Sequence, residues 1–231
     1  MKALVTGGAG FIGSNLAEAL LQRSFNVVIF DDFSTGSKEN IPDDGRIRVI
    51  KGDVRDFNKL KDAAKGRDVI FHMAAQVGNV LSLKKPQENM EINAVGTLNA
   101  IRVCKELGIK SIIYSSSCAN FGETKYAPID ESHPMSPVSP YGVSKLAGEQ
   151  LCLALGPIYG VKAACLRYFN VYGKNQRFNP YGNVLPIFAD RIKNGKPLTI
   201  YGDGKQTRDF VDVRDVGSAN LLAFEKGAEG A

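Results

Sequence analysis

A tyrosine and a lysine four residues apart, Tyr141 and Lys145, are the pair in this sequence best suited to moving a proton. Ser139-Pro140 precedes them as the expected N-cap and first residue of a helix, Pro140–Leu155. Because helical positions i and i+4 share one face, the phenol and the amine would lie one turn apart. A nearby ammonium favours the phenolate and lowers a tyrosine pKa from its usual value of about 10. The pair therefore predicts a group that takes or returns a hydroxyl proton.

Three consecutive serines, Ser115–Ser117, follow the apolar run Ile112–Tyr114. Ligands of open α/β sheets bind at the carboxyl ends of the strands, so a serine there can hydrogen-bond a reacting oxygen. A serine nucleophile is the alternative, and it needs a general base and an oxyanion hole. The sequence has no GxSxG motif, and His133 lies in a proline-flanked segment without an orienting partner. These observations weigh against a hydrolase.

A glycine-rich turn, Gly7–Gly13, follows the strand-like run Ala3–Thr6 and opens a helical pattern, Phe11–Arg23. This is the context in which GxGxxG binds a dinucleotide. The early glycines allow a tight turn and let the backbone approach a pyrophosphate, and the last one lets helix and sheet pack closely. The start of the helix then favours the negative charge. We expect cofactor contacts from Gly7, Gly10, Phe11, Ile12 and Gly13.

Acidic and small residues end the next strand-like runs. Asp31 and Asp32 follow the second run, where a carboxylate binds the adenosine ribose hydroxyls. Two carboxylates there would repel a 2′-phosphate, so the sequence predicts NAD rather than NADP. Asp53 could meet the adenine amino group, and small residues after the fourth run would let the backbone approach the cofactor. The expected contacts at these two later ends are Asp53, Val54, Ala74, Ala75 and Gln76.

Short apolar runs alternate with helical patterns, which indicates a doubly wound α/β domain with a parallel sheet. The expected strands are Lys2–Thr6, Asn26–Phe30, Ile47–Lys51, Asp68–His72, Ser111–Ser115 and Val161–Leu166. Further helices are expected at Phe57–Lys65 and Pro86–Leu107. After Arg167 a loop is predicted at Tyr168–Tyr181, then helix Asn183–Lys193, strands Leu198–Tyr201 and Asp209–Val213, and helix Arg214–Lys226. We divide the chain into a Rossmann domain, 1–167, and a partial substrate lobe, 168–231, interleaved with it.

Composition excludes several other classes. The net charge of +5 comes from scattered basic residues, so no nucleic-acid surface is predicted. The four cysteines form no CxxC pair and there are two histidines, so reduced thiols and no metal are expected. A leader peptide and an apolar run long enough to span a membrane are both missing from the sequence, which predicts a cytoplasmic protein with no membrane contact.

The ordered motifs resemble the extended short-chain dehydrogenases/reductases of the NAD-dependent epimerase/dehydratase family, which act on nucleotide sugars. The resemblance covers essentially the whole chain. Besides the residues above, it includes His72–Ala75, Asn93 with Gly96-Thr97, Arg167–Gly173 and Arg208–Asp212. It implies a catalytic triad of Ser117, Tyr141 and Lys145. It also implies NAD contacts from Ser34, Thr35, Gly36, Asn93, Ser115, Tyr141, Lys145 and Tyr168, and UDP-sugar contacts from Ser117, Asn170, Asn183, Val184, Leu185, Tyr201 and Arg208.

The resemblance also implies a reaction. Sugar dehydratases of the family carry Asp-Glu after the catalytic serine or threonine, and decarboxylases keep the Glu, whereas this sequence has Cys118-Ala119. Without these carboxylates, oxidation and reduction at C4 of a UDP-sugar remain, which is 4-epimerisation. Asn120-Phe121-Gly122 replaces the usual Val-Tyr-Gly. Net oxidoreduction and a non-catalytic NAD-binding module are the alternatives, because the chain ends at Ala231 with an incomplete substrate lobe. The family often forms homodimers through the two long helices, and we expect one here.

Overall fold

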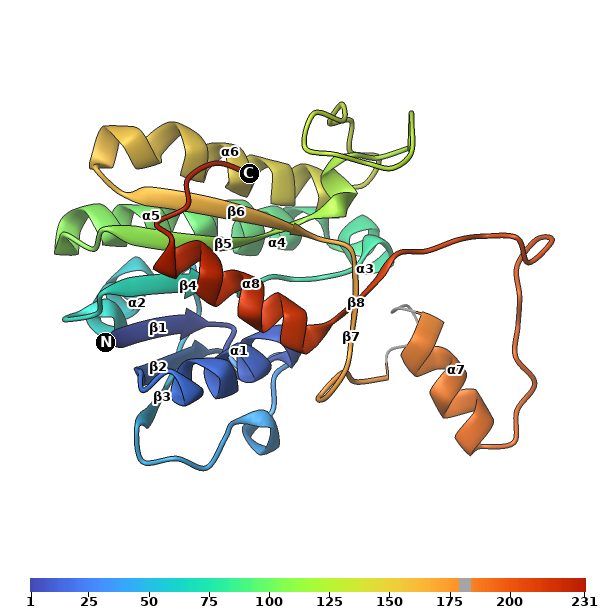
Figure 1. The fold of residues 1–231 in the computed structure, drawn as a ribbon, viewed down its shortest axis with the longest axis horizontal. Helices are drawn as coiled ribbons and strands as arrows, with labels where there is room; N and C mark the ends of the chain where they lie inside the picture. The colour runs from blue at the N-terminus through green and yellow to red at the C-terminus, as the bar shows by residue number, and fades with distance from the viewer. Residues whose placement is uncertain (179–183) are drawn as a thin grey trace.

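Six strands form one parallel sheet in the order β3-β2-β1-β4-β5-β6 (Figure 1). The structure is a computed structural model of the 231-residue chain that describes residues 1–178 and 184–231. Every residue of β4 and β5 is buried, as expected of parallel strands covered on both faces. The six predicted strands and the doubly wound α/β fold are confirmed. The strands are β1 (Lys2–Thr6), β2 (Asn26–Asp31), β3 (Ile47–Lys51), β4 (Val69–His72), β5 (Ser111–Ser117) and β6 (Lys162–Tyr168).

The strand order reverses beside β1, which pairs with β2 on one side and β4 on the other. Thr6 at the end of β1 is in register with Phe30 of β2 and His72 of β4. The segments that follow these strands therefore leave the sheet from the same edge. Such a switch point is where open α/β sheets bind their ligands.

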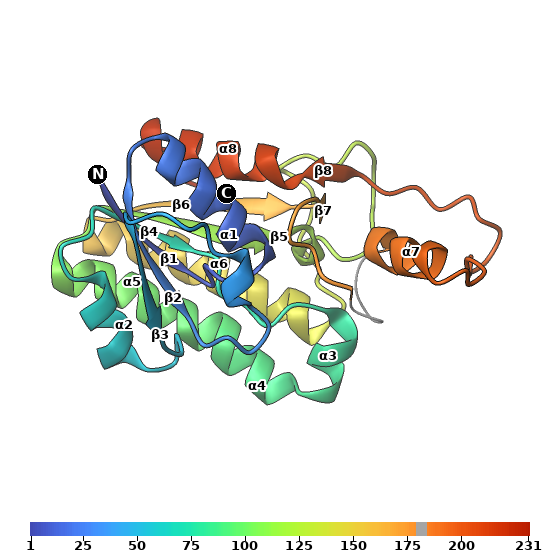
Figure 2. The same cartoon turned by 90° about the horizontal axis from the view of Figure 1, so that it is seen from below.

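Helices cover both faces of the sheet (Figure 2). One face packs on α1 (Phe11–Gln22) and α8 (Val213–Glu225) through a cluster that includes Leu16, Leu20 and Leu221. The other packs on α2 (Phe57–Ala64), α5 (Gly96–Leu107) and α6 (Pro140–Tyr159) through a cluster that includes Leu60, Ile101 and Cys152. The short helix η1 is Lys38–Asn40. Among the described residues, the helices lack the combination of length and apolar character needed to cross a bilayer.

The predicted helix Pro86–Leu107 is helical throughout, but it changes type in the middle. It consists of α4 (Pro86–Met90), a π-helical stretch η2 (Glu91–Val95) and α5. Before it stands α3 (Asn79–Lys84), which the sequence analysis missed. The wider π turn bears Asn93, a predicted cofactor residue, and such turns frequently mark functional sites.

Helix α6 runs four residues further than predicted. Gly156 was expected to end it, but the helix passes through Gly156 and Pro157, and the left-handed cap is Gly160. A Cβ at Gly156 would lie 2.8 Å from the Val161 carbonyl oxygen. This glycine therefore serves a close packing contact, and the residue that needs a positive φ lies one turn later.

Past β6 the chain leaves the main body and returns to it (Figure 1). It forms β7 (Asn170–Tyr172), then α7 (Val184–Lys193), which stands apart from the sheet, then β8 (Phe210–Asp212), parallel to β7. The loop predicted at Tyr168–Tyr181 was wrong where β7 lies. The strand predicted at Leu198–Tyr201 was also wrong, because that segment has no partner strand and its side chains are exposed. The proposed domain division stays a prediction.

Candidate active site

The glycine turn between β1 and α1 has no room for a side chain at Gly7 or at Gly13. Gly7 has φ +66°, and a Cβ there would lie 2.7 Å from the Ala74 nitrogen. A Cβ at Gly13 would lie 2.2 Å from the Gly7 carbonyl oxygen. Gly10 is the N-cap of α1 and has no side chain to bond the first-turn amides. The turn therefore fits a pyrophosphate on the start of the helix.

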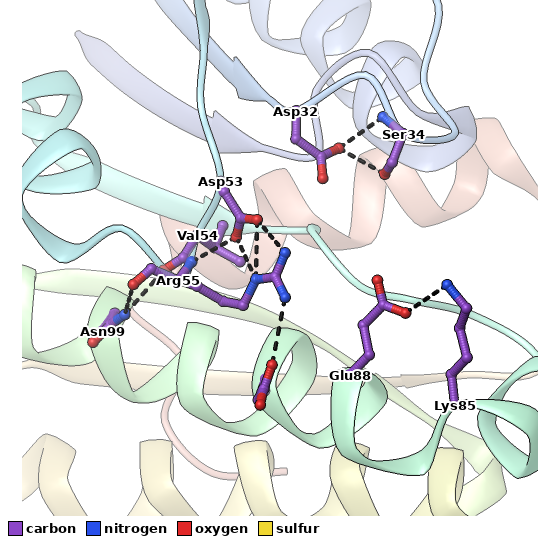
Figure 3. Close-up of polar contacts among 9 residues, drawn as sticks. Asp32, Ser34, Asp53, Val54, Arg55, Lys85, Glu88 and Asn99 are labelled. Atoms are coloured by element: carbon purple, nitrogen blue, oxygen red, sulfur yellow. Dashed lines mark hydrogen bonds and ion pairs between the residues drawn. The ribbon is translucent and has the colours of Figure 1, made fainter.

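Asp31, at the end of β2, is fixed beside this turn. Its carboxylate accepts hydrogen bonds from the Ala9 nitrogen at 2.9 Å and the Phe33 nitrogen at 2.8 Å. Burial raises the pKa of Asp31, and these two bonds oppose the shift. Asp32 accepts from the Ser34 nitrogen and hydroxyl (Figure 3). Asp31 is thus oriented to meet a ribose on the edge where the glycine turn lies.

Asp53, which was expected to meet the adenine, binds Arg55 in the structure (Figure 3). The Nη2 atom of Arg55 lies 2.5 Å from Oδ2 of Asp53, and its Nη1 atom lies 3.5 Å from Glu91. The Arg55 hydrogen bonds lower the pKa of Asp53. Asn99 donates to the carbonyl oxygens of Val54 and Arg55 and fixes this segment. The adenine contact of Asp53 stays a prediction.

Asn93 is buried and holds the segment after β4. Its Oδ1 accepts from the Gln76 nitrogen at 2.8 Å, and its Nδ2 donates to the Gln76 oxygen and to Ser144 Oγ. Asn89 also donates to the Gln76 oxygen and accepts from Ser144. The sequence analysis missed Asn89 and Ser144; the signal was an asparagine four residues before Asn93 and a serine within Tyr141–Lys145. Asn93 thus fixes the backbone of Gln76, in the segment that follows β4 at the carboxyl edge of the sheet.

A chain of buried hydrogen bonds joins β1 to the π turn. The Ala74 nitrogen donates to Thr6 Oγ1, which contacts His72 Nδ1 at 2.8 Å. His72 Nε2 lies 3.1 Å from Thr97 Oγ1, and the Thr97 hydroxyl donates its proton to the backbone carbonyl oxygen of Asn93. Thr97 can therefore only accept from His72, so Nε2 must carry the proton and Nδ1 must accept from Thr6. Burial lowers the pKa of His72 to about 3, so the ring is neutral.

We expect the chain's two histidines to be opposite tautomers in nitrogen NMR spectra. His133 Nε2 accepts from the Lys125 nitrogen and Nδ1 lies 2.9 Å from the Pro134 oxygen, so His133 carries its proton on Nδ1. His72 should keep its Nε2 proton and stay uncharged between about pH 5 and pH 8, where an ordinary histidine titrates. Titration of His72 in that range, or a proton on its Nδ1, would contradict the hydrogen-bond chain.

Ser117 and Tyr141 meet where β5 ends and α6 begins. Ser139 caps α6 by accepting from the Gly142 nitrogen at 3.1 Å, as predicted. Burial raises the pKa of Tyr141 to about 12, and a hydrogen bond with Ser117 acts in the opposite direction. The third residue, Lys145, is buried one turn along α6, with Nζ 4.4 Å from the centre of the Tyr114 ring. Burial lowers the pKa of Lys145 to about 7. The expected lowering of the Tyr141 pKa by Lys145 was wrong for this structure, because burial raises that pKa and the opposing shift comes from Ser117.

The remaining expected residues are less closely grouped. Ser115 is buried in β5, and the Tyr168 hydroxyl donates to Asn220 of α8 at 2.9 Å. The loop with Ser34, Thr35 and Gly36 packs on the glycine turn through the Ser37 nitrogen and the Ala9 oxygen. Of the expected substrate residues, Asn170 lies in β7 and its side chain donates to the backbone oxygen of Asp209. Tyr201 and Arg208 are exposed on the connection between α7 and β8. Val184 and Leu185 begin α7, and Asn183 lies outside the described residues.

A hollow of about 500 Å³ lies beside the end of β6. Its lining includes Phe121, Arg167, Tyr168, Asp209 and Val216. These residues come from β6, α8, the position just before β8 and the segment after β5, so the hollow adjoins the carboxyl edge of the sheet on the side of Ser117.

A Rossmann sheet with a glycine turn, an aspartate at the end of β2 beside that turn and a Ser-Tyr-Lys group defines a dinucleotide-dependent enzyme of the short-chain dehydrogenase/reductase type. The model of the NAD dependent epimerase/dehydratase family matches residues 3–231, and the chain belongs to this family.

Named relatives are similar over most of the chain. A protein of Methanocaldococcus jannaschii with the provisional name UDP-glucose 4-epimerase is 42% identical over 224 residues, 96% of this chain and 72% of the relative. Two solved structures share 38% identity. The UDP-N-acetylglucosamine 4-epimerase of Methanobrevibacter ruminantium, in complex with UDP-N-acetylmuramic acid, has a TM-score of 0.93 over 97% of this chain and 73% of its own. The UDP-glucose 4-epimerase of Thermus thermophilus, in complex with NAD, has a TM-score of 0.89 over 96% and 74%.

Proposed function

We propose that this protein is an NAD-dependent 4-epimerase of a UDP-sugar of the glucose and galactose type. One observation carries the proposal: Tyr141 lies in the first turn of α6, close enough to Ser117 for that hydroxyl to lower its pKa, and the buried amine of Lys145 lies one helical turn further on. The names of the relatives support a UDP-sugar, and the NAD complex of one of them supports the cofactor. The glycine turn and Asp31 fit that cofactor, because α1 begins there without a side-chain cap and the Asp31 carboxylate is fixed beside it at the switch point.

The residues of the chain suggest how the reaction would run. NAD, when bound, accepts a hydride from C4 of the sugar and returns it. Tyr141 takes the proton of the 4-hydroxyl group and later gives it back, and Ser117 hydrogen-bonds the same oxygen. Lys145 supports the phenolate by charge. After the 4-keto sugar has turned its other face, the same side chains protonate the product, and the net redox state is unchanged.

The residues after Ser117 favour epimerisation over elimination. A dehydratase needs an additional acid and base at the sugar, and Cys118 and Ala119 provide neither. Burial raises the pKa of the Cys118 thiol, so it stays protonated at neutral pH. Simple exchange of hydride and proton at C4 is the chemistry that remains.

A panel of UDP-hexoses tests the proposal. We expect the protein with NAD to convert UDP-glucose and UDP-galactose into one another, with no accumulation of NADH in the absorption spectrum. Accumulated NADH would support an oxidoreductase instead. Conversion of only the N-acetylated or uronic sugars would move the substrate to another nucleotide sugar. NAD binding with no turnover of any sugar would leave a non-catalytic module.

We also propose a homodimer through α4, η2 and α6. These elements pack side by side on one face of the sheet, and Met90, Val95 and Val143 are exposed on them. The apolar stripe of α6 lies half-buried or exposed, while its buried face is small and polar, with Ser144, Lys145 and Glu149. An exposed apolar surface of this kind marks a protein contact.

Sedimentation tests the dimer. We expect the wild-type protein to sediment as a dimer and Val95→Glu to sediment as a monomer, because a buried unpaired carboxylate is costly. Leu222→Glu on α8 is the matched control, since Leu222 is exposed on the opposite face of the sheet. A monomeric wild-type protein would refute the proposal.

The four cysteines are free thiols, which fits a reducing compartment, and we propose that the enzyme acts in the cytoplasm.

A further inference from the structure

A buried carboxylate, Glu149, lies on α6 eight residues after Tyr141 and four after Lys145. Its Oε1 accepts from Arg167 Nη2 at 2.7 Å. Its Oε2 accepts from Arg167 Nε at 3.1 Å, from Ser116 Oγ at 2.6 Å and from Asn120 Nδ2 at 3.0 Å. The side chain of Arg167, on β6, is 9% exposed, so both charges are removed from water.

The proton positions in this cluster are determined by its partners. Ser116 has one hydroxyl proton and directs it to Glu149, so its oxygen accepts from Asn120 Nδ2 at 2.9 Å. The Asn120 amide cannot be reversed, because both atoms facing its nitrogen are acceptors. The other atom of that amide, Asn120 Oδ1, is buried without a partner among the described residues. The arrangement brings two donors, Ser116 Oγ and Asn120 Nδ2, to Glu149. The unsatisfied amide oxygen that results costs stability.

The cluster joins the elements that carry the proton-transfer residues. Ser116 directly precedes Ser117 on β5, and Asn120 ends the short helix η3 (Cys118–Asn120) that Ser117 caps. Glu149 belongs to α6, the helix that carries Tyr141 in its first turn. Through one carboxylate, α6 is tied to both sides of Ser117 and to β6.

We propose that Glu149, paired with Arg167, is a positioning residue that sets the distance between the Ser117 hydroxyl and the Tyr141 phenol. The inference rests on the proposed function for its kinetic consequence, but not for its structural one. A buried ion pair is weak support for stability, since apolar residues of similar volume replace such pairs at little cost. Its geometry, by contrast, fixes a helix against a strand to within hydrogen-bond tolerance, and a misplacement of about 1 Å can cost about 100-fold in rate.

Two variants separate positioning from stability. Glu149→Gln removes the charge and leaves Arg167 buried and unpaired, so it should lower both the unfolding midpoint and kcat. The double variant Glu149→Leu/Arg167→Met removes both charges but leaves the Ser116 and Asn120 donors without this acceptor, so it should regain part of the midpoint but not kcat. We expect kcat to fall about 100-fold in both variants, with the KM for the UDP-sugar and the affinity for NAD changed less than about threefold. The control is Glu18→Gln, which breaks the exposed pair with Lys174.

An NMR measurement keeps the test independent of activity. In protein with ¹³C-labelled tyrosine, the Cζ signal of Tyr141 is identified by its loss in Tyr141→Phe. It should shift in both Glu149 variants and stay in place in Glu18→Gln and in the destabilised core variant Leu60→Ala. If the double variant has wild-type kcat, or if the Tyr141 signal does not move, Glu149 is not a positioning residue. If no sugar is turned over but the signal moves, the proposed function fails and the positioning role stands.

Discussion

Replacing Tyr141 by phenylalanine should lower kcat for C4 epimerisation by about 100- to 10,000-fold, the usual contribution of a positioned acid–base group. The ring still fills its place at the start of α6, but no atom remains to take the 4-hydroxyl proton. Affinity for NAD should stay within about threefold, because the glycine turn and Asp31 are on other elements. The fold should lose at most one hydrogen bond of the phenol, about 0.5–1.5 kcal/mol. Separation of the C4 epimers, NAD titration and thermal unfolding measure the three effects.

The matched control for this substitution is Tyr159→Phe, at the opposite end of the same helix. The ring of Tyr159 stacks with Lys105 at 4.6 Å, and that contact needs no hydroxyl group. Wild-type kcat is therefore expected for Tyr159→Phe. Equal inactivity of wild-type protein and Tyr141→Phe on both UDP-glucose and UDP-galactose would end the epimerase proposal. Full activity of Tyr141→Phe would assign the proton transfer to another group.

The sheet could be predicted from the sequence because all its strands except the edge strand β3 contain a continuous apolar run, which is typical of a parallel sheet buried on both faces. The glycine turn could be predicted because its steric demand is local. The end of α6 could not, since a Cβ at Gly156 would also lie 3.3 Å from the Cβ of Ala163 in β6, a contact that exists only once the helix packs on the sheet. Leu198–Tyr201 has the composition of a strand, but among the described residues no strand pairs with it. Propensity is overridden in both places by tertiary structure.

The residue types of the candidate site could be predicted from the sequence, but the contacts between those residues could not. Tyr141 and Lys145 were placed one turn apart on a helix, and the helix start at Ser139 is as predicted. That Lys145 lies over the Tyr114 ring depends on packing between α6 and β5, which no spacing reveals. The one sequence signal for the Glu149–Arg167 pair was a glutamate four residues after Lys145 on the predicted helix. The buried face of α6 is its polar one. If the apolar stripe were taken as the face that packs on the core, Glu149 would be placed on the exposed side of the helix.

Replacing Gly13 by alanine should weaken NAD binding by about 10- to 100-fold, equivalent to about 1.4–2.8 kcal/mol. The new Cβ would lie 2.2 Å from the Gly7 carbonyl oxygen and 2.8 Å from the Gly8 Cα atom. Both neighbours are backbone, so no side-chain rotation relieves the clash and the turn itself must widen. That movement displaces the amides at the start of α1 from the pyrophosphate. Overpacking should also lower the free energy of unfolding by about 1–3 kcal/mol.

A second glycine shows that the effect depends on place and not on the substitution. Gly217 is buried on α8, and a Cβ there would meet Ala19 at 3.6 Å, an ordinary contact. Gly217→Ala should therefore keep wild-type NAD affinity and gain about 0.5–1 kcal/mol from the better helix former. Calorimetric titration with NAD and thermal unfolding of both variants compare the two positions. Undiminished NAD affinity in Gly13→Ala would mean that the dinucleotide does not rest on this turn, and the site built around Asp31 and Tyr141 would lose its cofactor.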